Sequence, residues 1–212
     1  MPQITNYDST EEHFNVITHG IGAVIAIIAS ALLLYKSSFL AASEWFSLWV
    51  YAFSLIMMLA CSTLYHWAKT EAKRHWYKKL DHTAIYYLIA GTYTPFLYLN
   101  IPTAKAHYLL IALWIIAAIG TVFKLCFAHR FAKVSLAAYL LMGWFAVLMI
   151  NDMQHYLKKG CLTLLVVGGL AYTVGALFYA LKQVRYTHVI WHIFVLIGAG
   201  SHFLAIYLYA FS

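Results

Sequence analysis

The sequence predicts an all-α integral membrane protein, a single bundle of seven transmembrane helices, and three observations support this fold class. Hydrophobic residues make up 64% of the 212 residues and charged residues only 10%, whereas a soluble domain carries about 25% charged residues. Seven apolar runs approach the roughly 20 residues that a helix needs to cross a bilayer. The connections between them are short and hold nearly all the charges. This composition excludes a water-soluble globule, and it also excludes disorder, which requires low hydrophobicity.

The seven predicted spans follow one another with little sequence between them. In chain order they are Phe14–Tyr35, Trp45–Tyr65, Asp81–Leu99, His107–Phe127, Val134–Ile150, Cys161–Leu181 and Val189–Phe211. Each run is continuous, whereas a barrel strand would alternate apolar and polar residues over about 10 positions. The fifth run is the shortest. We therefore expect a single seven-helix domain over residues 14–212, preceded by a cytoplasmic tail at residues 1–13.

Lysine and arginine are distributed unequally between the two sides of this bundle. Ten lie at or after the ends of spans two, four and six: Lys69, Lys73, Arg74, Lys78, Lys79, Lys124, Arg130, Lys133, Lys182 and Arg185. The opposite side holds four: Lys36, Lys105, Lys158 and Lys159. Cytoplasmic loops are enriched in these residues, so the N-terminus is predicted in the cytoplasm and the C-terminus outside a cell (inner) membrane. Membrane topology then explains the net charge of +7, which does not indicate nucleic-acid binding.

The N-terminal residues argue against a cleaved signal peptide, and the cysteines argue against a disulfide framework. The first residues include Asp8, Glu11 and Glu12 but no lysine or arginine, which is the opposite of the basic start of a cleaved signal peptide. The three cysteines are widely spaced and form no CxxC pair. They therefore predict neither a disulfide framework nor a cysteine metal site.

Ionisable residues from three different spans are predicted to lie at one depth of the membrane. His66 closes span two, Asp81 opens span three, and His188 and His192 flank the start of span seven. The predicted topology places all four in the cytoplasmic half of the bilayer. Ionisable groups inside a membrane are costly, so such a group is a candidate functional residue by default.

The spacing of these residues suits a metal site. Residues four apart share one helical face, so His188 and His192 can bind one cation, and His66 from a neighbouring helix would complete a three-histidine site. Zn²⁺ favours such ligands and keeps a fourth position for water when the site is catalytic. Asp81 could bind that water or orient a ligand, and Ser62, one turn from His66, could hydrogen-bond the water or a substrate carbonyl. The alternative is structural: histidines can anchor helix ends at the headgroups, and Asp81 can be a helix N-cap.

Other polar residues allow simpler interpretations. Glu12, Asn15 and His19 recur at helical spacing where span one begins; they either line the site entrance or form an amphipathic helix start. His202 lies about 15 Å further along the seventh span, too far to share the ion, and is predicted to be a packed polar residue. Lys124 is predicted to snorkel to the cytoplasmic interface.

Three motifs spread over the spans combine into a pattern: Ser62-xxx-His66, Lys79-Leu-Asp81 and His188-xxx-His192. Three more stretches strengthen it: Ser9-xx-Glu12-xx-Asn15-xxx-His19-Gly20, Ala90-Gly91-Thr92-Tyr93-Thr94-Pro95-Phe96 and Ala128-His129-Arg130-Phe131. Over almost the whole chain, these motifs resemble the progestin and adipoQ receptor family, most closely its bacterial haemolysin III-like branch. The resemblance implies a zinc ion held by His66, His188 and His192, with Asp81 contacting it through water. It also implies a cytoplasmic N-terminus, and the wider superfamily includes alkaline ceramidases.

Three functions remain open at this point. The first is a zinc-dependent hydrolase of a membrane lipid amide or ester, with Asp81 as general base and Ser62 stabilising the oxyanion. The second is a non-enzymatic, zinc-containing sensor or membrane-homeostasis protein with the same ligands. The third is a pore-forming, haemolytic protein. A lytic toxin must first be secreted in soluble form, which argues against this third function.

Overall fold

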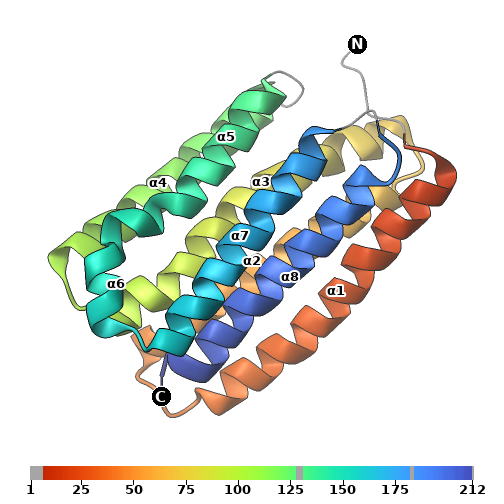
Figure 1. The fold of residues 1–212 in the computed structure, drawn as a ribbon. Coiled ribbons are helices and arrows are strands. Elements are labelled where there is room, and N and C mark those ends of the chain that lie inside the picture. The colour runs from red at the N-terminus through yellow and green to blue at the C-terminus, as the bar shows by residue number, and fades with distance from the viewer. Residues whose placement is uncertain (1–6, 128–130, 182–183, 212) are drawn as a thin grey trace.

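The computed structural model of the chain describes residues 7–127, 131–181 and 184–211, and within these ranges it is helical and contains no β-strand. Figure 1 shows the bundle. The helices are α1 (Ser9–Lys36), α2 (Ala42–Trp67), α3 (Glu71–Pro95), α4 (Ala104–Phe127), α5 (Ala132–Gly143), α6 (Ile150–Tyr156), α7 (Lys159–Ala180) and α8 (Thr187–Tyr209). A π-helical segment, η1 (Phe96–Asn100), continues α3, and a 3₁₀ segment, η2 (Trp144–Met149), joins α5 to α6. The prediction of an all-α protein is confirmed.

Among the residues that the structure describes, six helical segments are long and apolar enough to cross a membrane: α1, α2, α4, α7, α8 and the segment Lys133–Tyr156. The chain is therefore a multi-pass integral membrane protein. The predicted third span behaves differently, because α3 begins at Glu71, ten residues before Asp81, and its first turns are rich in charged residues. The hydropathy of α3 alone does not establish a seventh crossing.

The two faces of α1 differ in the size and polarity of their side chains, as expected of a helix surrounded by lipid. Its inward face carries small and polar side chains: Glu11, Asn15, His19, Gly22, Ala26 and Ser30 are buried, with Leu33 as the one large apolar residue. Its outward face carries large apolar ones, with Ile21, Val24, Ile25 and Ile28 between 57% and 60% exposed. A water-soluble helix has the reverse arrangement. An outer surface of isoleucine and valine matches a hydrocarbon surrounding, in which these side chains need no protein cover.

Six helices surround the middle of the bundle, and α4 lies outside this group. The neighbouring pairs are α1 with α2, α2 with α3, α3 with α5, α5 with α7, α7 with α8, and α8 with α1. Helix α4 packs mainly against α3 and η1, and Figure 1 shows α4 and α5 along one edge of the bundle. The first turn of α1 and the last turn of α8 lie at opposite ends of the molecule (Figure 1). The interior enclosed by the six helices is where the predicted site residues meet.

Two predicted spans differ from the observed helices in ways that have local causes. The first helix begins at Ser9, not Phe14, because the Asp8 side chain accepts a hydrogen bond from the Thr10 backbone N–H at 3.2 Å and caps it. The fifth span, predicted to end at Ile150, continues to Tyr156 but is broken into α5, η2 and α6. A 3₁₀ segment inside a helix leaves the i+4 hydrogen-bond pattern, so hydropathy alone does not reveal such a break.

The contact between α7 and α8 depends on a glycine, and this leads to a stability prediction. A Cβ at Gly175 would lie 2.7 Å from the Phe194 Cβ and 2.8 Å from the Trp191 ring, whereas one at Gly169 would meet only the Trp144 ring at 3.8 Å. We expect Gly175→Ala to destabilise the protein by about 1–3 kcal/mol through overpacking. The control Gly169→Ala should be neutral or stabilising by about 0.5–1 kcal/mol, since alanine favours helix. Thermal unfolding in detergent checks both; equal melting temperatures for the two variants would contradict the prediction.

Candidate metal centre

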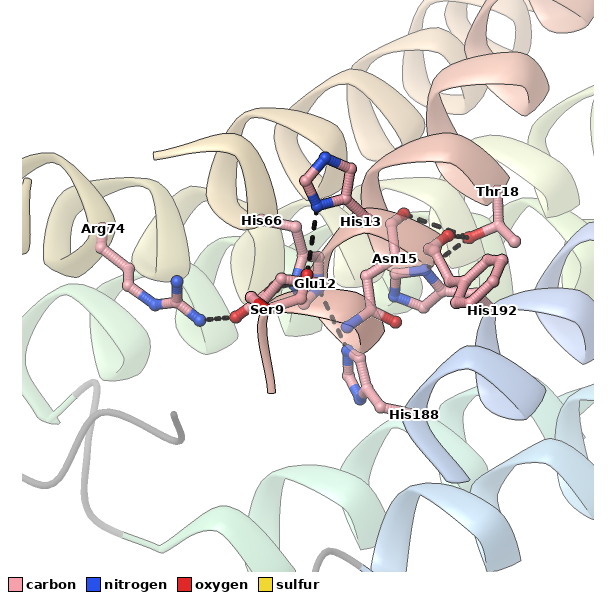
Figure 2. Close-up of polar contacts among 10 residues, drawn as sticks. Ser9, Glu12, His13, Asn15, Thr18, His66, Arg74, His188 and His192 are labelled. Atoms are coloured by element: carbon pink, nitrogen blue, oxygen red, sulfur yellow. Dashed lines mark hydrogen bonds and ion pairs between the residues drawn. The ribbon is translucent and has the colours of Figure 1, made fainter. Parts of the chain in front are cut away.

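Three buried histidines from two helices meet inside the bundle. His66 lies in the last turn of α2, and His188 and His192 lie in the first turns of α8. Their exposed fractions are 3%, 8% and 1%, and each offers one ring nitrogen within 4.8 Å of the other two. The His188 Nε2 and His66 Nε2 atoms are 3.1 Å apart (Figure 2). The structure thus brings together the three histidines singled out in the sequence.

The start of α8 explains why His188 and His192 lie at this depth. Tyr186, the residue before the helix, has a left-handed backbone with φ of 63°, which is unusual for a residue other than glycine. The buried Thr187 hydroxyl lies 2.9 Å from the Leu181 carbonyl and 2.8 Å from the Val184 carbonyl. These contacts tie the first turn of α8 to the end of α7. The helix therefore begins one residue before His188, and both histidines point inward.

The donor set fits a divalent metal ion. In a tetrahedral zinc site with Zn–N bonds of 2.0–2.1 Å, two ligand nitrogens lie about 3.3 Å apart, close to the distance between the His66 and His188 Nε2 atoms. The three ring centroids are 4.6 to 5.0 Å from one another. Three imidazoles at a buried site suit zinc and other borderline-soft metals. The structure thus contains a three-histidine group that can hold a metal ion.

The other ring nitrogens of two of these histidines contact α1. The His66 Nδ1 lies 2.6 Å from a carboxylate oxygen of Glu12, and the His192 Nδ1 lies 3.1 Å from the Thr18 hydroxyl. The Glu12 carboxylate also forms an ion pair with Arg74, at the start of α3 (Figure 2). The first, second, third and last long helices of the chain therefore all contribute to the surroundings of one site.

Ser62 and Asp81 lie beside the cluster without joining it. The Ser62 hydroxyl hydrogen-bonds to the Asp81 carboxylate, which also interacts electrostatically with His66 and Lys124. The Asp81 oxygens are not part of the three-histidine group, so Asp81 is not a direct ligand in this arrangement. Lys124 is 2% exposed within the protein. The prediction that Lys124 snorkels to the interface is therefore wrong, because its side chain is buried inside the bundle, where it interacts electrostatically with Asp81.

The α1 residues noted in the sequence are packed against the cluster. The His19 ring stacks on the His192 ring, with centroids 3.6 Å apart and planes at 8°, and Asn15 is fully buried nearby (Figure 2). The Tyr7 ring stacks on the His188 ring at a centroid distance of 4.7 Å. These residues thus cover the cluster, and they do not form the hydrated surface of an amphipathic helix start. His202 hydrogen-bonds the Leu165 carbonyl at 3.2 Å, as expected of a packed polar residue.

A mostly apolar cavity of about 220 Å³ extends from the cluster through the bundle. At one end its wall is formed by His19, Ser62, Asp81, His188 and His192. At the other end the wall is formed by Ile101, Met149 and Met153. The distance from Asp81 to Ile101, along α3 and η1, is roughly 30 Å at about 1.5 Å per residue. The polar site therefore lies at one end of an apolar cavity that runs most of the length of the bundle.

Comparison with known proteins identifies the family. The family model described as "Haemolysin-III related" matches residues 7–203. The chain belongs to the haemolysin-III related family. Among proteins similar to it, "Hemolysin-3" of Bacillus cereus is 38% identical over 200 residues, covering 94% of this chain and 91% of that protein. "Hemolysin-3 homolog" of Bacillus subtilis (strain 168) is 36% identical, covering 94% of each chain. The human "Monocyte to macrophage differentiation factor" is 31% identical over 207 residues, covering 95% of this chain and 85% of that protein.

The haemolysin III resemblance is confirmed by these matches, and most of its motifs lie at the cluster. Ser62, Asp81, His188 and His192 line one end of the cavity, and His66 belongs to the same histidine group. The stretch Ala90–Phe96 covers the end of α3 and the first residue of η1, and three of its residues, Thr92, Tyr93 and Phe96, line the same cavity. Residues 128–130 of the Ala128–Phe131 motif lie outside the described residues.

Sequence reasoning missed three contributors of this haemolysin III site: Thr18, Arg74 and Tyr7. The spacing of Glu12, Asn15 and His19 gave a signal for α1, since it places them on one helical face. Thr18 is adjacent to that face and carries no such signal. Arg74 belongs to a basic segment in which nothing distinguishes it from its neighbours, and its ion pair with Glu12 spans 62 positions.

Proposed function

We propose that this protein is a metal-dependent membrane hydrolase that cleaves an amide or ester bond of a lipid. The observation that carries the proposal is the cavity, whose apolar wall suits an acyl chain and whose polar end contains Ser62, Asp81 and two of the three clustered histidines. A substrate with a long apolar chain and a polar carbonyl linkage matches this distribution. Its acyl chain would occupy the cavity, and the linkage would lie beside Asp81.

His66, His188 and His192 would hold the metal, which we propose to be zinc. When bound there, zinc would lower the pKa of a coordinated water and polarise a carbonyl group. In the proposed mechanism Asp81 accepts the proton of the attacking water as general base. The water oxygen bonds to the carbonyl carbon, and Ser62 donates a hydrogen bond to the carbonyl oxygen as it gains charge. The carbon–nitrogen or carbon–oxygen bond then breaks, and Asp81 returns the proton to the departing amine or alcohol.

We further propose seven membrane crossings with the cluster in the cytoplasmic half of a cell (inner) membrane. Helix α3 has 25 residues and runs antiparallel between α2 and α4, and the opposite positions of the first and last turns (Figure 1) agree with an odd number of crossings. The basic residues Lys69, Lys73, Arg74 and Lys78 lie in the connection after α2 and in the first turns of α3, close in the chain to His66 in the last turn of α2. This distribution of basic residues supports a cytoplasmic N-terminus. Reporter fusions at the two termini test it, and equal labelling of both ends from one side would contradict it.

The function is tested by measuring free fatty acid released from defined lipids. The purified protein is reconstituted in nanodiscs that contain either a ceramide or a phospholipid ester, and the products are quantified by mass spectrometry. We expect release from one of these classes, loss of release with a chelator, and recovery on adding Zn²⁺. A zinc-loaded protein that cleaves no lipid amide or ester would contradict the hydrolase.

A non-enzymatic sensor or membrane-homeostasis protein with the same ligands is the second candidate. The stacking of Tyr7 on His188 and of His19 on His192 favours it, because both rings cover the cluster from the side of α1. A bound zinc ion that is not accessible to small anions such as azide would support this candidate. Coordination of azide to a Co²⁺-substituted protein would show an accessible coordination position and would argue against it.

A further inference from the structure

One histidine of the cluster is held from behind by a carboxylate. The His66 Nδ1 lies 2.6 Å from Glu12 Oε2, and the other Glu12 oxygen, Oε1, pairs with the Arg74 guanidinium. The His66 side chain is fully buried, and the Glu12 and Arg74 side chains are 13% and 15% exposed. The Arg74 guanidinium also lies 5.3 Å from the centre of the Tyr65 ring. Figure 2 shows this row of three side chains, contributed by α3, α1 and α2.

The two contacts of Glu12 divide its oxygens between two partners. A carboxylate only accepts hydrogen bonds, so the short contact with His66 requires a proton on the histidine Nδ1. The Nε2 atom, which faces His188, then carries the lone pair that can bind a cation. Arg74 pairs with the other carboxylate oxygen, so both oxygens of Glu12 have a protein partner. Glu12 therefore determines both the tautomer and the orientation of the His66 ring.

His192 has a different kind of partner. The Thr18 hydroxyl lies 2.8 Å from the Phe14 carbonyl and donates its proton there, so it accepts from the His192 Nδ1. This contact gives His192 the same tautomer as His66, with Nε2 left free. It is a neutral hydrogen bond, which is weaker than a charge-assisted one. Two of the three histidines are thus oriented by α1, and the contact with the greater electrostatic strength is the one made by Glu12.

We propose that Glu12 is a positioning residue of the metal site: it holds His66 in the tautomer and orientation that bind the ion, and Arg74 holds Glu12. The proposal rests on the metal site of the proposed function but not on hydrolysis. Carboxylates that accept the second N–H of a metal-bound histidine raise the basicity of the ligand, and their loss costs about 10- to 100-fold in metal affinity. The effect reaches the metal through His66, since Glu12 contributes no atom to the three-histidine group.

The test measures Co²⁺ affinity of the full-length protein in detergent by competition with a chelating dye. We expect Glu12→Ala to weaken binding by about 10- to 100-fold and to shift the visible absorption bands of bound Co²⁺. Glu12→Gln, which keeps the shape and an acceptor oxygen but loses the charge, should have a smaller effect in the same direction. The matched control is Glu71→Gln, because Glu71 is exposed in the first turn of α3 and is not part of the three-histidine group.

The Co²⁺ affinities, the spectra and the lipid assay together distinguish failure of the positioning role from failure of the metal site or of the hydrolase. If both Glu12 variants bind Co²⁺ as tightly as the wild type and with the same spectrum, the positioning role is wrong. If the variants then differ from the wild type only by a lower melting temperature, Glu12 serves only to connect α1 to α3. If Glu12→Ala does not fold, the nearly isosteric Glu12→Gln decides by its affinity and spectrum. If the wild type binds no divalent metal, the metal site and this proposal fail together. If the affinities change as expected but no lipid is cleaved, the hydrolase fails and the role of Glu12 stands.

Discussion

Asp81→Asn is expected to lower the turnover of a cleavable lipid amide or ester by about 10²- to 10⁴-fold, the usual contribution of a general base. Asparagine keeps the size of the side chain and can still accept the Ser62 hydrogen bond, but it cannot take a proton from water. The Asp81 oxygens do not belong to the three-histidine group, so the metal content should remain that of the wild type. Fatty acid release and metal content are measured on the same preparations.

The matched control for this substitution is Asp152→Asn. Asp152 lies in α6 and pairs with Lys105 at 3.5 Å, at the opposite end of the bundle from the cluster. An exposed pair of this kind contributes at most about 1 kcal/mol to stability, so turnover should be unchanged. Full turnover in Asp81→Asn would exclude Asp81 as the base. Joint loss of turnover and metal would instead show that Asp81 supports metal binding, a different role from the one proposed.

His192→Ala is expected to remove the bound metal. A zinc site contributes about 10–16 kcal/mol of binding free energy, so one ligand of three or four accounts for roughly 3–4 kcal/mol, which is two to three orders of magnitude in affinity. His192 is 1% exposed, and alanine offers no ligand atom in place of its ring nitrogen. Metal content by mass spectrometry, after purification without chelators, should fall from about one ion per chain to a small fraction of that value.

His202→Ala is the control on the same helix. His202 also lines the cavity, but its ring hydrogen-bonds the Leu165 carbonyl and takes no part in the three-histidine group. Its replacement should leave the metal content unchanged, even if the thermal stability falls because a carbonyl loses its partner. A wild-type protein without metal, or equal metal contents in His192→Ala and the wild type, would refute the site.

The sequence predicted most of the fold because its helices are set by hydropathy. Long apolar runs can satisfy their backbone groups inside a membrane only as helices, so the runs marked the helices directly. The errors occur where hydropathy carries no information. Gly143 and Trp144 lie inside an apolar run, yet the helix changes there to a 3₁₀ segment. Glu71 begins a helix whose first turns are polar because they lie beyond the apolar part of the bundle.

The candidate site was predictable to the extent that helical spacing places residues on one face. His188 and His192 are four residues apart on α8, so their approach follows from the helix alone. We predicted that His66 joins them because all three lie at the same depth in the membrane. Depth alone does not determine whether the side chain of a residue points into the bundle or away from it. The contacts of Arg74 with Glu12 and of Thr18 with His192 depend on which helices become neighbours. Those pairings connect residues 62 and 174 positions apart and carry no local signature.

The position of α1 and α8 side by side has a consequence for how the protein is made. α1 is synthesised first and α8 last, and the contact between Thr18 and His192 spans 174 positions. At about 5–20 residues per second, roughly 9–35 seconds separate the two residues during translation. Throughout that interval, Glu11, Asn15 and His19 are present in the nascent chain without the α8 surface that finally buries them. The three-histidine group is therefore complete only after His192 has been synthesised and α8 has docked against α1 and α2.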